Sequence, residues 1–168
     1  RWTGSTPIFL NRSSRRVRPG GSAAISDDGT RVAFSRQRGS DLELEVAPFG
    51  GGQSLVVAAS SSPEQNPAWS PDGSLLAFFR DDSLMVAAPS ADATPRRVGS
   101  VSGTGPAAWS ADGRTIVYLK TTRGPVVLVD LATGSERAIT IPDSVGAVWA
   151  GAEVLSPDGR ELLIATSF

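Results

Sequence analysis

The sequence predicts an all-β chain, a β-propeller of four-stranded antiparallel blades, and three observations lead to this prediction. One short phrase returns four times, as AISDDG, AWSPDG, AWSADG and VLSPDG. The aspartates before the final glycines stand at positions 28, 72, 112 and 158, so they are spaced 44, 40 and 46 residues apart. A period of about 40 to 45 residues is typical of a propeller blade. The 18 glycines and 12 prolines divide the chain into short segments, as in other all-β folds.

Each of the four phrases is a tight turn whose residue types fit their positions. Serine at the first position, proline at the second and glycine at the fourth are the preferences of a type I turn. Glycine can adopt the left-handed conformation that closes a hairpin, and aspartate hydrogen-bonds to nearby backbone groups. We therefore predict a hairpin corner at each phrase. The structural turn residues are Ser26, Asp28, Gly29, Ser70, Asp72, Gly73, Ser110, Asp112, Gly113, Ser156, Asp158 and Gly159.

The segments beside the corners are predicted to be buried strands. Apolar residues on both strand faces follow each glycine, for example Val32, Ala33 and Phe34, and such a run indicates a strand covered on both sides. A large apolar residue stands just before each serine, and we expect these four residues to pack in the core. They are Ile25, Trp69, Trp109 and Leu155. A second hairpin pattern follows each of the first three corners, so each unit has four strands, A to D.

The blade pattern describes a single domain with a half blade at each end. Joining the two half blades would close a ring of four blades and remove the exposed sheet edges. Alternatively, the chain is part of a larger propeller whose remaining blades lie on a missing segment or a second chain. Because the chain begins with Arg1, we expect it to be a processed or excised piece. The predicted units are a C–D half blade at 1–20, full blades at 21–62, 63–101 and 102–142, and an A–B half blade at 143–168.

The Ser-Pro-Asp-Gly corner and its flanks resemble the TolB-like propeller repeat, a WD40-like repeat of bacterial proteins. The resemblance covers about residues 21 to 168, because all four corners share the turn and the apolar flanks. Asp27 and Ala111 depart from it at the proline position, and Ile25 and Leu155 depart at the tryptophan position. These mild departures leave the fold prediction unchanged.

The resemblance implies a non-catalytic binding module in the bacterial cell envelope. Its partner would be another protein, either of the envelope or of a signalling system. Its location would be the periplasm or the cell surface, either as a periplasmic protein or in association with a lipoprotein. One alternative is the substrate-gating propeller of a prolyl oligopeptidase-type serine peptidase, whose catalytic domain is absent from this chain. A sensor of glycans or small molecules is a further alternative.

The residue types argue against catalysis and against a metal or cofactor site within this chain. The sequence has no histidine and no cysteine, which excludes a Ser-His-Asp triad and zinc sites of the His/Cys type. The acidic pairs Asp27–Asp28 and Asp81–Asp82 lack the spaced oxygen ligands of a calcium loop, and we interpret them as solvated turn residues. We therefore predict that the chain is not an enzyme and holds no cofactor.

Charge and hydropathy limit the partners in a similar way. The formal net charge of −1 does not favour nucleic acid, and no apolar run approaches the roughly 20 residues of a membrane-spanning helix, so we expect no direct membrane insertion. A cluster of arginines near the N-terminus could contact a partner, or it could be a charged outer strand that resists edge pairing. The cluster is Arg12, Arg15, Arg16 and Arg18.

The sequence also predicts the solvent exposure of three acidic residues and of the tryptophans. Asp41, Glu43 and Glu45 alternate with leucines and are expected to line the solvent-facing side of one strand. Trp149 lies outside the repeat register, so it is a candidate for partner contact, whereas Trp69 and Trp109 occupy the repeated core position.

Overall fold

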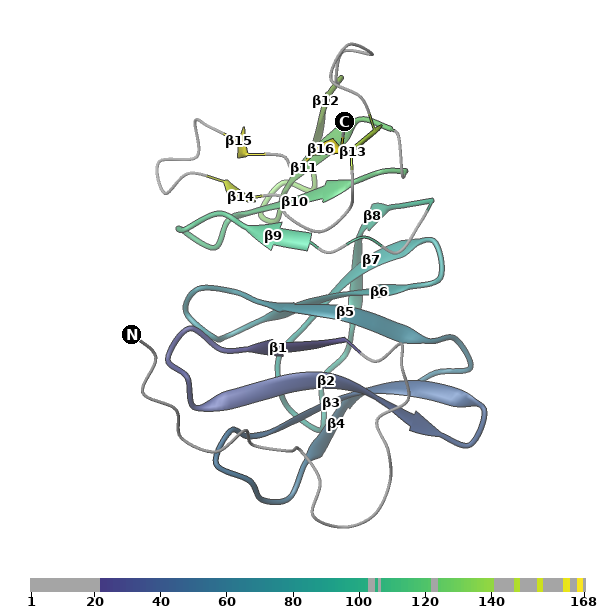
Figure 1. Cartoon of the computed structure of the whole chain (residues 1–168), viewed down its shortest axis with the longest axis vertical. Helices are drawn as coiled ribbons and strands as arrows, with labels where there is room; N and C mark the ends of the chain where they lie inside the picture. Colours follow the sequence, from purple (N-terminus) through teal and green to yellow (C-terminus); the bar gives the residue numbers. More distant parts are fainter. Residues whose placement is uncertain are drawn as a thin grey trace.

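The computed structural model describes residues 22–102, 105, 107–121 and 124–140, with the pairs 147–148, 154–155, 162–163 and 166–167. Every regular element in this part of the chain is a β-strand (Figure 1). Three four-stranded antiparallel sheets follow one another along the sequence, each in the simple order A-B-C-D. The prediction of an all-β fold of antiparallel four-stranded blades is confirmed for these residues.

The three sheets are called the first, second and third blades. The first consists of β1 (Ala23–Ile25), β2 (Arg31–Arg38), β3 (Asp41–Pro48) and β4 (Leu55–Ala58). The second consists of β5 (Glu64–Trp69), β6 (Leu76–Arg80), β7 (Ser83–Ala87) and β8 (Arg96–Ser100). The third consists of β9 (Ala107–Trp109), β10 (Thr115–Leu119), β11 (Val126–Asp130) and β12 (Glu136–Ile139).

Four short strands follow the third blade. They form two antiparallel pairs, β13 (Ala147–Val148) with β16 (Thr166–Ser167), and β14 (Val154–Leu155) with β15 (Leu162–Leu163). The second pair continues the repeat, because Leu155 pairs with Leu162. The same seven-residue step pairs the residue before the corner serine with a residue of the B strand in each blade: Ile25 with Val32, Trp69 with Leu76, and Trp109 with Ile116.

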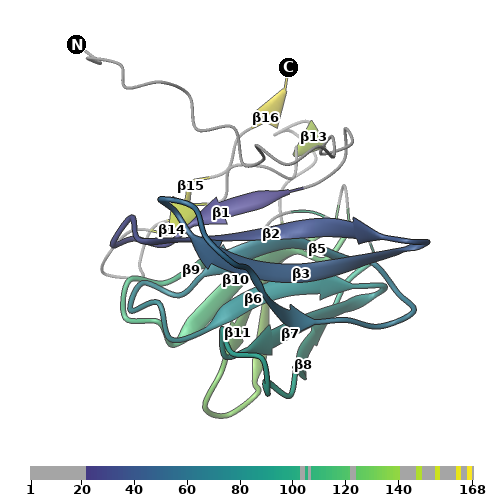
Figure 2. The ribbon, with the colours of Figure 1, turned by 90° about the horizontal axis from the view of Figure 1, so that it is seen from below.

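The blades are stacked in chain order, and their A strands lie next to one another. β1 contacts β5, β5 contacts β9, and β9 contacts β14. Figure 1 shows the three sheets one above another, and in the view from below the first blade lies over the strands of the second and third (Figure 2). This placement of equivalent strands is the arrangement of neighbouring propeller blades.

Apolar side chains fill both seams between the blades. The seam between the first and second blades holds Leu44, Phe78 and Met85, which are at most 7% exposed. The seam between the second and third blades holds Phe79 and Tyr118, which are at most 1% exposed. Alternate residues of β6 point into opposite seams, so this B strand is covered on both faces, as the sequence predicts.

The predicted half blade at 1–20 lies outside the described residues, and the half blade at 143–168 is described only at its four short strands. Closure of a four-bladed ring therefore stays a prediction, and so do the blade boundaries.

Candidate functional site

The corners have one repeated geometry, which begins with the serine. Ser26 Oγ donates a hydrogen bond of 2.5 Å to Asp28 Oδ1 and accepts one of 3.0 Å from the backbone N–H of Arg31. The N–H of Gly29 donates to the carbonyl of Ser26 at 2.8 Å, and Gly29 has a φ of 69°. That φ lies in the left-handed region, which glycine adopts without a steric cost.

The second and third corners repeat the first. Ser70 and Ser110 each donate to the corner aspartate at 2.6 Å, and each accepts from a backbone N–H five residues later at 2.9 Å. Gly73 and Gly113 have φ values of 67° and 69°. The fourth corner, with Ser156, Asp158 and Gly159, lies outside the described residues.

The corner aspartates are held in their ionised form by these hydrogen bonds. The hydroxyl of Ser26 and the N–H of Thr30 lower the pKa of Asp28 from 3.8 to about 2. The pKa of Asp72 is lowered to about 2 in the same way by Ser70 and Ser74, and the pKa of Asp112 is also lowered. A carboxylate whose acceptor positions are used within its own turn is a poor general acid or base at neutral pH.

The hollow between the first two corners is too small for an ordinary ligand. Its volume is about 30 Å³, whereas ligand pockets measure roughly 300–1,000 Å³. Among the described residues, no group of three or more acidic, histidine or cysteine side chains is placed to hold a metal ion. The hollow is lined by Ser26, Asp27, Asp28, Pro71, Asp72 and Gly73.

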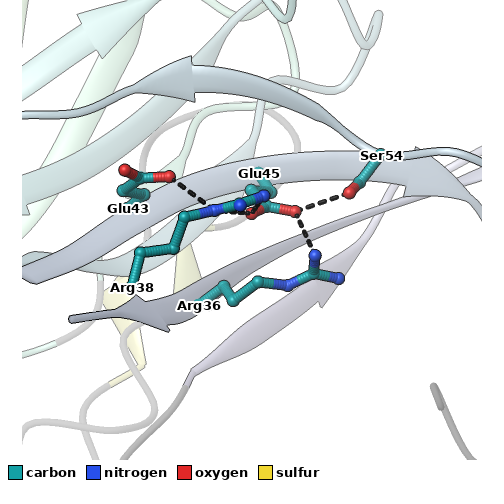
Figure 3. A network of polar contacts seen from close by, with 5 residues as sticks. All are labelled: Arg36, Arg38, Glu43, Glu45 and Ser54. Atoms are coloured by element: carbon teal, nitrogen blue, oxygen red, sulfur yellow. Dashed lines mark hydrogen bonds and ion pairs between the residues drawn. The ribbon is translucent and has the colours of Figure 1, made fainter. Parts of the chain in front are cut away.

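A network of charged side chains lies on the first blade, centred on Glu45 (Figure 3). Glu45 Oε1 accepts from Arg38 Nε at 3.1 Å and from Arg38 Nη2 at 2.8 Å. Its Oε2 accepts from Ser54 Oγ at 2.6 Å and lies 3.1 Å from Arg36 Nη1. Arg38 also pairs with Glu43 at 2.9 Å. Both oxygens of Glu45 are therefore fully used.

The burial of Glu45 corrects the prediction that Asp41, Glu43 and Glu45 face solvent. The Glu45 side chain is 0% exposed, and that of Glu43 is 19% exposed. The three carboxylates do share one strand face, but Arg36 and Arg38 extend from the neighbouring strand and cover the centre of that face. The alternation of acidic residues and leucines indicates which residues share a strand face. Whether that face is buried depends on the side chains of the neighbouring strand.

One basic residue recurs near the end of each B strand, at the end of the blades opposite the corners. We call this the far end. Arg36 pairs with Glu45 at 3.1 Å, Arg80 with Glu64 at 2.8 Å and Lys120 with Glu136 at 3.9 Å. The three cations occupy equivalent positions, but their acidic partners come from β3, β5 and β12. The far end thus carries partly exposed positive charge, with side chains that are 24–44% exposed.

Glu64 is a buried acid that the sequence analysis missed. Its Oε1 accepts from Arg80 Nε at 2.9 Å and from Ser60 Oγ at 3.0 Å, while Oε2 has no hydrogen-bond partner among the described residues. Burial raises the pKa of Glu64, and the hydrogen bond from Ser60 and the charge of Arg80 oppose the rise. No sequence motif marks this residue, since its partner Arg80 is 16 positions away.

The tryptophans at the repeated core position connect one blade to the next. Trp69 Nε1 donates to the carbonyl of Ala24, and Trp109 Nε1 donates to that of Ala68, each at 3.1 Å. The guanidinium of Arg31 lies 4.4 Å from the ring centre of Trp69. These rings are part of the seams and do not form an open stacking platform for a sugar. Trp149 and the cluster Arg12, Arg15, Arg16 and Arg18 lie outside the described residues.

Within the part of the chain that the structure describes, no helix is long and apolar enough to span a membrane. No model of a known protein family matches the sequence.

Short stretches of the chain are similar to bacterial TolB proteins. The Tol-Pal system protein TolB of Bordetella pertussis is 44% identical over 54 residues, which are 32% of this chain and 12% of that relative. The TolB of Actinobacillus pleuropneumoniae serotype 5b is 38% identical over 72 residues, which are 41% of this chain and 17% of that relative. The chain thus spans only a small part of the relatives that it matches.

Solved structures show the same fold. A putative TolB from Agrobacterium tumefaciens has a TM-score of 0.65 at 22% identity, over 84% of this chain and 52% of that chain. TolB from Acinetobacter baumannii has a TM-score of 0.64 at 17% identity, over 76% of this chain and 33% of that chain. The tricorn protease has a TM-score of 0.61 at 15% identity, over 81% of this chain and 14% of that chain. The repeated corner, the blade topology and the sequence matches together show that the described blades have the β-propeller fold of TolB-like proteins.

Proposed function

We propose that the chain is part of a non-catalytic protein-binding module of the bacterial envelope. The observation that carries this proposal is the 44% identity with a Tol-Pal system protein, together with the propeller fold. A propeller offers two ends at which loops from successive blades come together, and loops on a rigid scaffold are common binding elements. By likeness to the Tol-Pal proteins, the partner is another protein and the location is outside the cytoplasm.

The far end is the better candidate for the contact surface. At the opposite end, the corner carboxylates are committed to hydrogen bonds within their own turns. The far end instead presents partly exposed cations and two exposed acids, Asp81 and Asp82, in the β6–β7 turn. Mixed exposed charge of this kind sets partner choice and association rate more than affinity.

Affinity capture tests the proposal. The full-length protein that contains this chain is used to capture partners from an envelope extract, and cross-linking with mass spectrometry locates the contact. We expect one reproducible protein partner with cross-links at the far end. Repeated capture of no macromolecule would contradict a binding role, and fractionation that places the protein in the cytoplasm would contradict the location.

Two matched variants locate the contact more sharply. Asp82→Lys changes an exposed acid at the far end, and Asp92→Lys makes the same change in an exposed turn at the corner end. We expect Asp82→Lys to slow partner association and Asp92→Lys to leave it unchanged, as measured by surface plasmon resonance with the captured partner. Equal association rates would show that the far end is not the contact surface.

A second function is favoured by the likeness to the tricorn protease, in which a region of the same fold belongs to a peptidase. In that case the chain would be the gating propeller of a serine peptidase, as in the prolyl oligopeptidase type. The complete reading frame decides between the two functions. A downstream α/β-hydrolase segment with a Gly-x-Ser-x-Gly elbow would favour gating, and its absence would favour the binding module.

A further inference from the structure

The β2–β3 hairpin of the first blade extends further at the far end than the β6–β7 hairpin of the second blade. Eight residue pairs join β2 and β3, whereas five pairs join β6 and β7. Counted from the corner glycines, Arg36 is equivalent to Arg80, which forms the last pair of the shorter hairpin. At roughly 3.3 Å per residue, two further pairs project about 7 Å. The two neighbouring blades therefore form a step, with the longer hairpin as its wall and the β6–β7 turn as its floor.

The wall of the step presents an uncharged surface above the second blade. Gln37 pairs with Leu42 in the projecting part of the hairpin. Leu44 and Val46, which lie on the same face of β3 as Leu42, are buried in the seam against the second blade. Gln37 and Leu42 therefore face the side of the second blade, where Leu42 is partly exposed and Gln37 is exposed.

The floor of the step carries two exposed carboxylates, those of Asp81 and Asp82. The hydroxyl of Ser62 donates a hydrogen bond to Asp81 Oδ2, and the N–H of Val101 donates to the carbonyl of Asp82 at 3.0 Å. The turn is thus fixed by the connecting segments on both sides of the second blade. A turn that is already ordered lowers the cost of ordering when a partner binds.

Buried Glu64 adds a third negative charge beside this turn. It pairs across the strands with Arg80, the residue that precedes Asp81. Both contacts of the guanidinium go to Glu64 Oε1, while Oε2 has no hydrogen-bond partner among the described residues. A buried carboxylate oxygen without a donor is unfavourable unless positive charge lies near it. Three carboxylates and one guanidinium leave an excess of two negative charges at this place.

This excess of negative charge is not a property of the repeat. In the first blade, Gln37 and Arg38 stand at the positions equivalent to Asp81 and Asp82. In the third blade, two threonines stand there, at positions 121 and 122. The acids are therefore specific to the second blade, and only there does a longer uncharged hairpin stand beside them on the preceding blade.

We propose that this step binds a basic side chain of a partner protein, a lysine or an arginine next to an apolar residue in an extended segment. The cation lies against Asp81 and Asp82, and the apolar neighbour lies against Leu42. Glu64 makes no contact with the partner and acts through its charge. The inference rests on the proposed binding function and adds the chemistry of the partner at the far end.

The charge of Glu64 makes this binding depend on pH. Burial raises the pKa of Glu64, and the charge of Asp81 raises it further. A bound cation favours the ionised carboxylate, so binding releases a proton, and affinity rises as the pH rises past the ordinary glutamate value of 4.5. The other charged groups at this place are Arg80 and Asp82. The side chains that the first blade directs towards this end are uncharged: Ser35, Gln37, Leu42 and Leu44.

Two matched double variants of the full-length protein test the contact. Asp81→Asn with Asp82→Asn removes the carboxylates of the floor, and Asp27→Asn with Asp92→Asn removes two exposed acids at the corner end. We expect the first variant to bind the partner captured from the envelope extract about tenfold more weakly and the second to bind it as before. Equal affinity of the two variants would overturn this inference and leave the proposed binding role intact.

A peptide probe tests the same chemistry without a captured partner. The acetylated amides of leucyl-lysyl-leucine and leucyl-glutamyl-leucine are added at millimolar concentration to the ¹⁵N-labelled full-length protein. We expect the lysine peptide to shift the amide signals of Leu42 and of residues 80–83, and the glutamate peptide to leave them unchanged. Equal shifts with the two peptides, or no shifts at these residues, would overturn the proposal.

Glu64→Gln tests the buried charge separately from the floor. We expect this variant to lose the rise in affinity for the lysine peptide above pH 4.5, whereas Glu43→Gln, on the opposite face of the first blade, should retain it. A purely structural role of Glu64 would weaken binding at every pH and leave its pH dependence unchanged. An unchanged pH dependence in Glu64→Gln would therefore show that this charge does not act on the ligand.

Discussion

The two faces of the first blade are built from the same strands but pack by different physical means. The face that meets the second blade is apolar and includes Ala33, Leu44 and Val46, which are at most 4% exposed. The opposite face, which includes Phe34 and Glu45, buries Glu45 beneath two arginines. The repeat therefore specifies the backbone and the corner of each blade, whereas the side chains that pack on each face differ from one face to the next.

The largest expected effect comes from the core position that precedes the corner serine. Trp69→Ala removes a ring that fills the first seam and donates to Ala24, and we expect it to lower the free energy of unfolding by about 3–5 kcal/mol. Ile25→Ala, at the equivalent place in the first blade, should cost about 1 kcal/mol, because this side chain is half exposed. Urea unfolding of the full-length protein, followed by circular dichroism, measures both. Equal losses would show that the two faces are equally buried.

Substitutions in the charged network around Glu45 should have the next largest effect on the free energy of unfolding. Glu45→Gln replaces one carboxylate oxygen by an N–H₂ group that cannot accept from Arg36, Arg38 or Ser54. We expect a loss of about 1.5–3 kcal/mol, as for other hydrogen bonds to charged groups. Glu43→Gln is the matched control, with one ion pair at a partly exposed site and an expected loss of at most about 1 kcal/mol. If the control were the more damaging variant, Glu45 would not be the centre of the network.

The corners should behave alike whichever seam lies beside them. Ser26→Ala and Ser70→Ala each remove a buried hydroxyl that accepts a backbone N–H and donates to the corner aspartate. We expect each to cost about 1 kcal/mol in urea unfolding, since a typical hydrogen bond contributes that much. A clear difference between the two losses of unfolding free energy would mean that the neighbouring seam affects the stability of the corner. The corners would then not be independent of the seams.

The smallest effect is the pH dependence of the corners. The pKa values of Asp28 and Asp72 are about 2 in the folded chain, below the ordinary value of 3.8. The folded state therefore binds fewer protons than the unfolded state in this interval. The stabilisation from these carboxylates is fully present above the ordinary value and is lost as the pH falls towards 2. Thermal unfolding between these pH values should show a shallower slope for Asp28→Asn with Asp72→Asn than for the unchanged protein.

A matched pair of substitutions makes the pH experiment specific. Asp81→Asn with Asp82→Asn removes two acids from the far end, at which no corner hydrogen bonds are made. We expect this pair to retain the slope of the unchanged protein. A slope that flattens equally in both double variants would assign the pH dependence to general charge and not to the corners.

The sequence alone was sufficient for the features that depend on near neighbours. A corner is complete within six residues, from Ser26 to Arg31, so the residue types that form it can be read from one short phrase. The pairing register follows from the corner, because a tight turn leaves only one alignment for the flanking strands. The four-stranded blades and their period were predicted for the same reason.

Only the tertiary structure decided which side chains are covered and by what. Glu45 was predicted to face solvent, but it is buried because Arg36 and Arg38 cross from the next strand. Arg31 donates to the carbonyl of Gly73, 42 positions away, and no local pattern marks that contact. Turn geometry depends on a few adjacent residues, whereas burial and ion pairing depend on distant residues that folding brings together.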